Sequence, residues 1–81
     1  MLQVAPHARA ALHAPSQTDE QRLAISALFK RWTDEGQVRE VTKALTLPYG
    51  RIVIFATRYM LAGGLSSARV GVDRDGSVSG L

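Results

Sequence analysis

The sequence predicts a mainly α-helical domain, in which three helices are followed by a small β-hairpin. Two observations carry this prediction. Apolar residues recur at helical spacing in three successive segments, residues 19–35, 37–46 and 51–62. After Gly63 and Gly64 the spacing changes to alternation, which is typical of a strand with one buried face.

Length and composition agree with one small globular domain. The chain has 81 residues, of which 46% are hydrophobic and 21% are charged. It contains no cysteine, which excludes a disulfide scaffold, cysteine-type zinc fingers and thiol catalysis. We find neither an apolar run long enough to span a bilayer nor the features of a signal peptide, so we expect a cytoplasmic protein with no membrane contact.

The N-terminal segment, residues 1–17, is rich in Ala and contains two prolines and two histidines. We expect a flexible arm here, with room for a short helix at residues 8–12, and a folded domain in residues 18–81. His7 and His13 stand six residues apart without a third ligand, so they do not predict a metal site.

The first helix is predicted at residues 19–35. Thr18 and Gln21 have the spacing of a capping box, in which each side chain bonds the other residue's backbone N–H. Gly36 is suited to end the helix. One face carries an apolar stripe at i, i+3, i+4 and i+7: Ile25, Leu28, Phe29 and Trp32.

Two further helices are predicted on the same kind of evidence. The segment 37–46 repeats Val38, Val41 and Leu45 at i, i+3 and i+7, and Pro48 cannot continue it. The turn follows at residues 47–50. The next segment, 51–62, carries apolar residues at i, i+3, i+4 and i+7: Ile52, Phe55, Ala56 and Tyr59.

The C-terminal residues predict a β-hairpin. Ala68, Val70 and Val72 alternate on one side of a strand. The sequence of residues 73–76, Asp-Arg-Asp-Gly, favours a turn, and Val78 is expected to point inward from the returning strand.

The segment 38–65 carries a family resemblance. Its first part resembles a positioning helix that ends in Leu-x-Leu, residues 48–51 resemble the following turn, and the Ala-Gly-Gly-Leu of residues 62–65 resembles a small-residue exit into a wing. The order of elements over residues 19–81 resembles the winged helix-turn-helix fold. The resemblance implies that the 51–62 helix lies in the DNA major groove and that residues 73–76 form the wing tip.

The function that this resemblance implies is a small transcriptional regulator that binds duplex DNA as a homodimer and needs no cofactor. The net charge of +3 suits such a partner, and residues 51–69 contain three arginines and no acid. The candidate groove contacts are Arg51, Thr57 and Arg58. The candidate contacts to the DNA backbone are Arg39, Lys43, Tyr49 and Arg74.

The outward face of the 51–62 helix departs from the family pattern, because it is mainly β-branched and aliphatic where a base-reading helix is polar. Three explanations stay open: contacts with thymine methyl groups, an interface with a partner or second copy, or burial on both sides of a central helix. The alternative function is therefore a winged-helix protein-interaction module, such as an accessory subunit or an inhibitor, encoded by a phage or plasmid. Its anchor residues would be Val53, Ile54, Met60 and Leu61.

No catalytic constellation is present in the sequence. Residues 73–76 open like a calcium loop, but the glycine comes too early and no glutamate follows Glu40. Ser66 and Ser67 have no histidine partner that would activate a nucleophile. We therefore expect a protein that is not an enzyme, with no catalytic residues, no metal and no cofactor.

Overall fold

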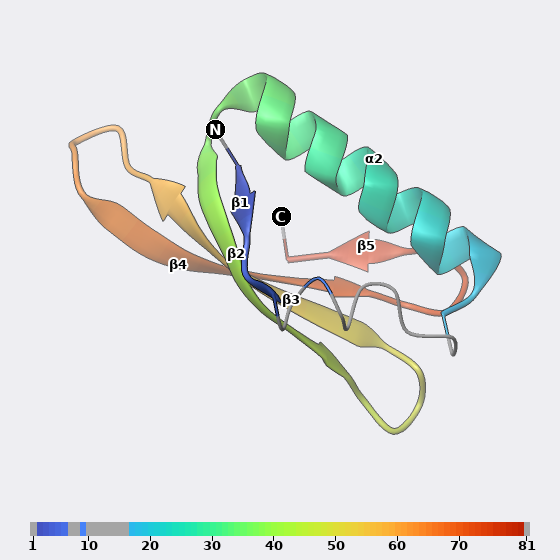
Figure 1. The fold of residues 1–81 in the computed structure, drawn as a ribbon. Coiled ribbons are helices and arrows are strands. Elements are labelled where there is room, and N and C mark those ends of the chain that lie inside the picture. The colour runs from blue at the N-terminus through green and yellow to red at the C-terminus, as the bar shows by residue number, and fades with distance from the viewer. Residues whose placement is uncertain (1, 7–8, 10–16, 81) are drawn as a thin grey trace.

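The computed structural model describes residues 2–6, 9 and 17–80. Within them, five strands form one sheet in the order β1-β2-β3-β4-β5; β1 runs parallel to β2, and every other pair is antiparallel. A single long helix, α2, lies over one face of this sheet (Figure 1), so the domain has two layers. The elements are β1 (Gln3–Val4), α2 (Asp19–Glu35), β2 (Val38–Thr46), β3 (Ile52–Tyr59), β4 (Leu65–Val72) and β5 (Val78–Ser79).

The predicted helix at 19–35 is confirmed as α2, with both of its ends. Thr18 Oγ1 accepts a hydrogen bond from the Gln21 backbone N–H at 3.1 Å, and Gln21 Oε1 accepts one from the Thr18 N–H at 3.0 Å. At the other end, Gly36 has a φ of 63°, a left-handed conformation that suits glycine, and its N–H donates to the carbonyl of Trp32. Local capping chemistry thus sets the length of the helix.

The N-terminus of α2 is also tied to two distant turns. Gln21 Nε2 donates to the carbonyl oxygens of Gly50, at 2.6 Å, and Val72, at 3.3 Å. Thr18 Oγ1 donates to the carbonyl of Arg74 at 2.6 Å. Gln21 is buried, so its amide replaces water as the partner of these backbone groups.

The core lies between α2 and the sheet. From α2 it takes Ile25, Leu28 and Trp32, and Phe29 packs against its margin. Removal of this apolar surface from water is the main stabilising contribution in a domain of this size. The sheet contributes a matching apolar layer: Val38, Val41, Ala44, Ile52, Ile54, Ala56, Val70 and Val72.

The prediction of a mainly α, three-helix fold is wrong, because the segments 37–46 and 51–62 form strands β2 and β3. This sheet-rich architecture conflicts with a helix-turn-helix or winged-helix fold. In β2 the pairing with β3 shifts register twice, between Val38 and Glu40 and again between Val41 and Lys43. Each irregularity adds one residue between two positions that face the core. Val38, Val41 and Ala44 are therefore three residues apart instead of two, and this spacing resembles that of a helix.

The helical reading of β3 has a different cause. Its buried residues, Ile52, Ile54 and Ala56, alternate as strand residues should, whereas Val53 and Phe55 lie half-buried on the other side. The i, i+3, i+4, i+7 set that predicted a helix therefore joins residues from opposite faces of the sheet. The strand is rich in β-branched and aromatic residues, which favour a pleated surface.

The predicted C-terminal hairpin agrees with β4, a turn and β5. The Gly76 N–H donates to the Asp73 carbonyl at 2.9 Å, which closes the turn at the expected residues. Asp75 Oδ1 accepts a hydrogen bond from the Ser77 N–H, and this bond lowers the pKa of the Asp75 carboxyl. Val78, which we expected to point inward, is exposed and lies outside the core.

The N-terminal segment is only partly described. Gln3 and Val4 form β1, whereas the predicted helix at residues 8–12 falls largely outside the described residues. In the described part of the chain, no helix combines the length and apolarity needed to cross a bilayer.

Candidate nucleic-acid interface

The side of the sheet that faces away from α2 is the main unexplained surface, and we call it the open face. None of the described elements covers it. Its side chains come from alternate positions of three strands, because successive residues of a strand point to opposite sides. The open face consists of Glu40, Lys43, Leu45, Val53, Phe55, Thr57, Tyr59, Leu65, Ser67, Arg69 and Gly71.

One row across the open face places an aromatic ring between two cations. Phe55 pairs with Lys43 of β2 on one side and with Arg69 of β4 on the other. Phe55 is half-buried, and both cationic side chains are exposed. Among the described residues, neither Lys43 nor Arg69 takes part in an ion pair. The row therefore presents two cations without ion-pair partners beside an aromatic surface, and Glu40 is the one acid among the described residues of this face, opposite Thr57 in the next row.

The next row is apolar and forms the floor of a hollow. Leu45 pairs with Val53, and Val53 pairs with Gly71, which is covered by the guanidinium of Arg51. The hollow has a volume of about 460 Å³, within the range of sites that hold small organic groups. It is lined by Leu45, Leu47, Arg51, Val53, Phe55, Arg69, Gly71, Ser79 and Gly80.

Arg51 closes one end of the open face. Its Nη1 donates to Asp73 Oδ1 at 2.8 Å and its Nη2 to Ser79 Oγ at 2.7 Å, so the guanidinium lies across β4 at Gly71. A Cβ at Gly71 would collide with the guanidinium, so this arrangement requires glycine there. The partnership with Asp73 compensates the charge of Arg51, unlike those of Lys43 and Arg69.

The structure brings together only some of the predicted DNA contacts. Lys43 and Arg51 lie on the same side of the sheet, and Thr57 shares that side, but its hydroxyl is buried without a partner among the described residues. Arg58 lines a pocket on the helix side instead. The other three lie at separate positions: Arg39 exposed on β2, Tyr49 exposed in the β2–β3 turn, and Arg74 against Gly50.

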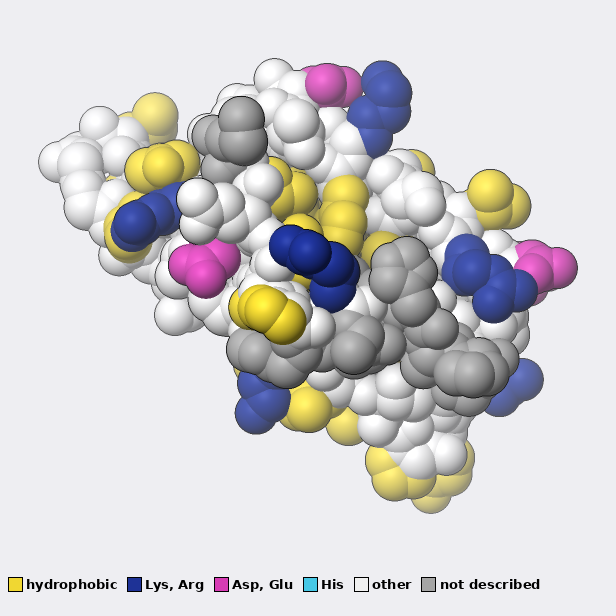
Figure 2. Space-filling view, viewed as in Figure 1, with side chains coloured by type: hydrophobic (Ala, Val, Ile, Leu, Met, Phe, Trp, Pro, Cys, Tyr) yellow, Lys and Arg dark blue, Asp and Glu magenta, His cyan; other side chains and the backbone are white. Residues whose placement is uncertain are grey.

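The predicted protein-interface residues do not form one continuous surface either. Ile54 is fully buried under α2 and cannot reach a partner, whereas Val53 faces the hollow. Met60 and Leu61 lie at the tip of the β3–β4 hairpin, and Leu61 is fully exposed. Figure 2 shows hydrophobic side chains at this tip, which projects at one end of the sheet.

The sequence reasoning missed Phe55 and Arg69 as functional candidates. The helical spacing assigns Phe55 to the apolar face of a helix, and Arg69 belongs only to the basic segment 51–69. A signal for Phe55 was available, because Arg51, Val53, Phe55 and Thr57 alternate along one side of a strand. Arg69 joins them only through the register between β3 and β4, which no local pattern reveals.

The chain matches no protein-family model, no curated protein and no solved structure. The described residues contain no group of three or more His, Cys, Asp or Glu side chains that could hold a metal ion.

Proposed function

We propose that the protein binds single-stranded nucleic acid across the open face of its sheet. The observation that carries the proposal is the row formed by Lys43, Phe55 and Arg69. An aromatic ring offers a stacking surface to any base, and unpaired cations beside it attract the phosphate backbone. Both requirements are met within a single row of three strands.

The spacing within this row suits a flexible strand. Adjacent strands lie about 4.8 Å apart, so the backbones that carry Lys43 and Arg69 are about 10 Å apart, with Phe55 between them. A base that stacks on the exposed part of the ring would have a cation on either side. The apolar hollow beside the row, floored by Leu45 and Val53, offers room for a neighbouring base or sugar.

The shape of this surface favours a single strand over a duplex. The DNA major groove admits an α-helix or a two-stranded ribbon, and the cations here lie on the face of a sheet of at least three strands. In a duplex the bases are stacked on each other and cannot lie flat against Phe55. In a single strand the bases can be splayed onto a flat protein surface. Residues 52–59 form β3, so the predicted helix at 51–62 that would enter a groove does not exist.

A titration with labelled oligonucleotides tests the proposal. We expect fluorescence anisotropy at low salt to show at least tenfold tighter binding of a single strand of about twelve nucleotides than of a duplex of the same length. Phe55→Leu keeps an apolar side chain but removes the ring, and should weaken binding by about tenfold. Lys43→Gln with Arg69→Gln should lower the slope of log K against log salt by about 1.4.

The matched control for the charge change is Lys30→Gln on the outer surface of α2, which removes one cation far from the open face. It should leave the affinity nearly unchanged. Undetectable binding of single strands at low salt, or equal losses of affinity in the Lys30→Gln variant and in the Lys43→Gln, Arg69→Gln double variant, would reject the proposal.

A second candidate function is self-association through the β3–β4 hairpin. Its tip, residues 59–65, contains no charged residue, and the side chains of Met60 and Leu61 are exposed. Such an uncharged projecting patch is typical of an interface with another protein chain.

Light scattering over a concentration series tests this second candidate. We expect the mean mass of the wild-type protein to rise toward that of a dimer with concentration, and Leu61→Ser to prevent the rise. The control is Leu23→Ser, the same change at an exposed leucine of α2. A monomeric mass for the wild-type protein at every concentration would exclude self-association.

A further inference from the structure

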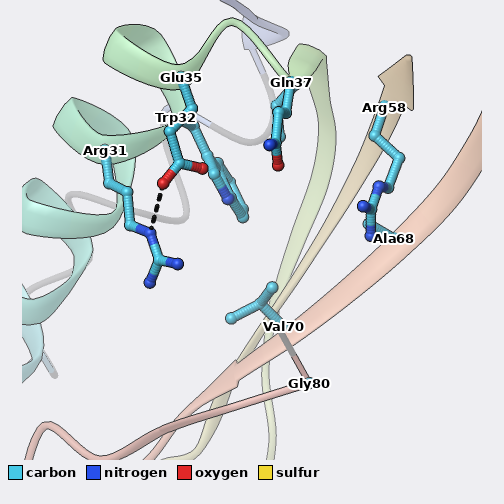
Figure 3. A pocket seen from close by; sticks show the side chains of 9 residues that line it. Arg31, Trp32, Glu35, Gln37, Arg58, Ala68, Val70 and Gly80 are labelled. Atoms are coloured by element: carbon cyan, nitrogen blue, oxygen red, sulfur yellow. Dashed lines mark hydrogen bonds and ion pairs between the residues drawn. The ribbon is translucent and has the colours of Figure 1, made fainter. Parts of the chain in front are cut away.

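A second, separate pocket lies on the helix side of the sheet, where α2 ends. It has a volume of about 90 Å³, which is room for about three water molecules or for a group the size of acetate. Figure 3 shows side chains from α2 and from the strands converging on this space. Its lining residues are Arg31, Trp32, Glu35, Gln37, Val38, Arg58, Ala68, Val70 and Gly80.

The indole of Trp32 supplies an unused donor in this pocket. Trp32 is 5% exposed, and its ring forms part of the pocket wall (Figure 3). Its N–H makes no hydrogen bond to any other described residue, and its nitrogen is not one of the buried unpartnered atoms, so water in the pocket can reach it. A hydrogen-bond acceptor in the pocket would satisfy it.

Two arginines face the same space from opposite walls. Arg31 donates through Nε to Glu35 Oε1 at 2.9 Å, which leaves both of its Nη groups without a partner among the described residues. Arg58 reaches in from β3 and has no ion pair in the described part of the chain (Figure 3). Arg31 offsets the charge of Glu35, so Arg58 contributes a net positive charge to the pocket.

We infer that this pocket binds a small carboxylate. Its two oxygens would accept hydrogen bonds from the Trp32 indole N–H and from the guanidinium of Arg58, with Arg31 completing the donors. The floor of Val38 and Val70 suits a short apolar group attached to the carboxylate. The carboxylate of Glu35 disfavours a doubly charged anion such as phosphate. The site lies on the face opposite to the open face, shares only Gly80 with the lining of the hollow there, and does not rest on the proposed nucleic-acid binding.

The test uses the indole N–H resonance of Trp32, the only tryptophan in the chain. A two-dimensional ¹⁵N–¹H spectrum therefore has one indole cross-peak. We expect this peak to move in a saturable way as sodium acetate is added in the millimolar range. Propionate should give the same shift at equal or lower concentration, because its extra methylene contacts Val38 and Val70.

Paired variants and salts decide the outcome. Arg58→Gln should weaken acetate binding by about tenfold or more, whereas Lys30→Gln removes a cation outside the pocket and should leave binding unchanged. An equal shift with sodium chloride, no saturable shift with any carboxylate, or an Arg58→Gln variant that titrates like the wild type would overturn the inference. Tighter binding of phosphate than of acetate would overturn the assignment to a carboxylate.

Discussion

Replacing Ile54 by Asp is expected to prevent folding. The side chain of Ile54 has 0% exposure at the centre of β3, between Ala44 of β2 and Val70 of β4. A carboxylate there would be buried without a partner, which costs more than about 4 kcal/mol and approaches the whole stability of a small domain. Far-ultraviolet circular dichroism and thermal unfolding of the purified variant measure this directly.

The neighbouring Val53→Asp provides the matched control. Val53 lies on the open face and is half-buried, so the new carboxylate can stay hydrated. We expect this variant to fold with a loss of about 1–2 kcal/mol in the free energy of unfolding. A folded Ile54→Asp variant that lost only a partner complex would show instead that Ile54 faces outward, as in the helical reading of the sequence.

Replacing Gln21 by Leu is expected to lower the free energy of unfolding by about 3 kcal/mol. Leucine keeps most of the side-chain volume but removes the amide. The carbonyl oxygens of Gly50 and Val72 then lose their side-chain donor, and the capping box loses its reciprocal bond to Thr18. Because Gln21 is buried, water cannot easily replace these bonds. Urea denaturation followed by the fluorescence of Trp32 measures the change.

The control for Gln21 is the same substitution at an exposed glutamine. Gln37 follows the end of α2, and its side chain donates no hydrogen bond to a described residue. Gln37→Leu should change the free energy of unfolding by less than about 0.5 kcal/mol. If both variants lost a similar free energy of unfolding, the hydrogen bonds of the buried Gln21 amide would contribute nothing beyond the effect of a glutamine-to-leucine change at an exposed position.

Helix α2 could be predicted from the sequence because its determinants are local. Thr18, Gln21 and Gly36 fix its ends through bonds that span three or four residues. The C-terminal hairpin could be predicted for the same reason, since a tight turn at residues 73–76 joins strands with plain alternation. Both features depend on neighbours along the chain.

Strand β2 could not be predicted in the same way, because its irregularities depend on its partner. The register shifts that separate Val38, Val41 and Ala44 by three exist only in the pairing with β3. The candidate interface shares this difficulty. Lys43, Phe55 and Arg69 become neighbours through register alone, at separations of 12 and 14 residues along the chain. The sequence of each segment shows the individual residues, but only the pairing of the strands shows that they are neighbours.

The bonds from the start of α2 to the distant turns also bear on how quickly the chain folds. Gln21 bonds to residues 29 and 51 positions away, and Thr18 bonds to a residue 56 positions away. Closing such long loops costs conformational entropy, and this cost comes before the contacts that stabilise the closed loop have formed. Helix α2 can begin to form by itself, but the bonds from Thr18 and Gln21 can form only after strands β2, β3 and β4 have paired. Folding is therefore expected to be slower than in a bundle of three helices, where most contacts are near in sequence.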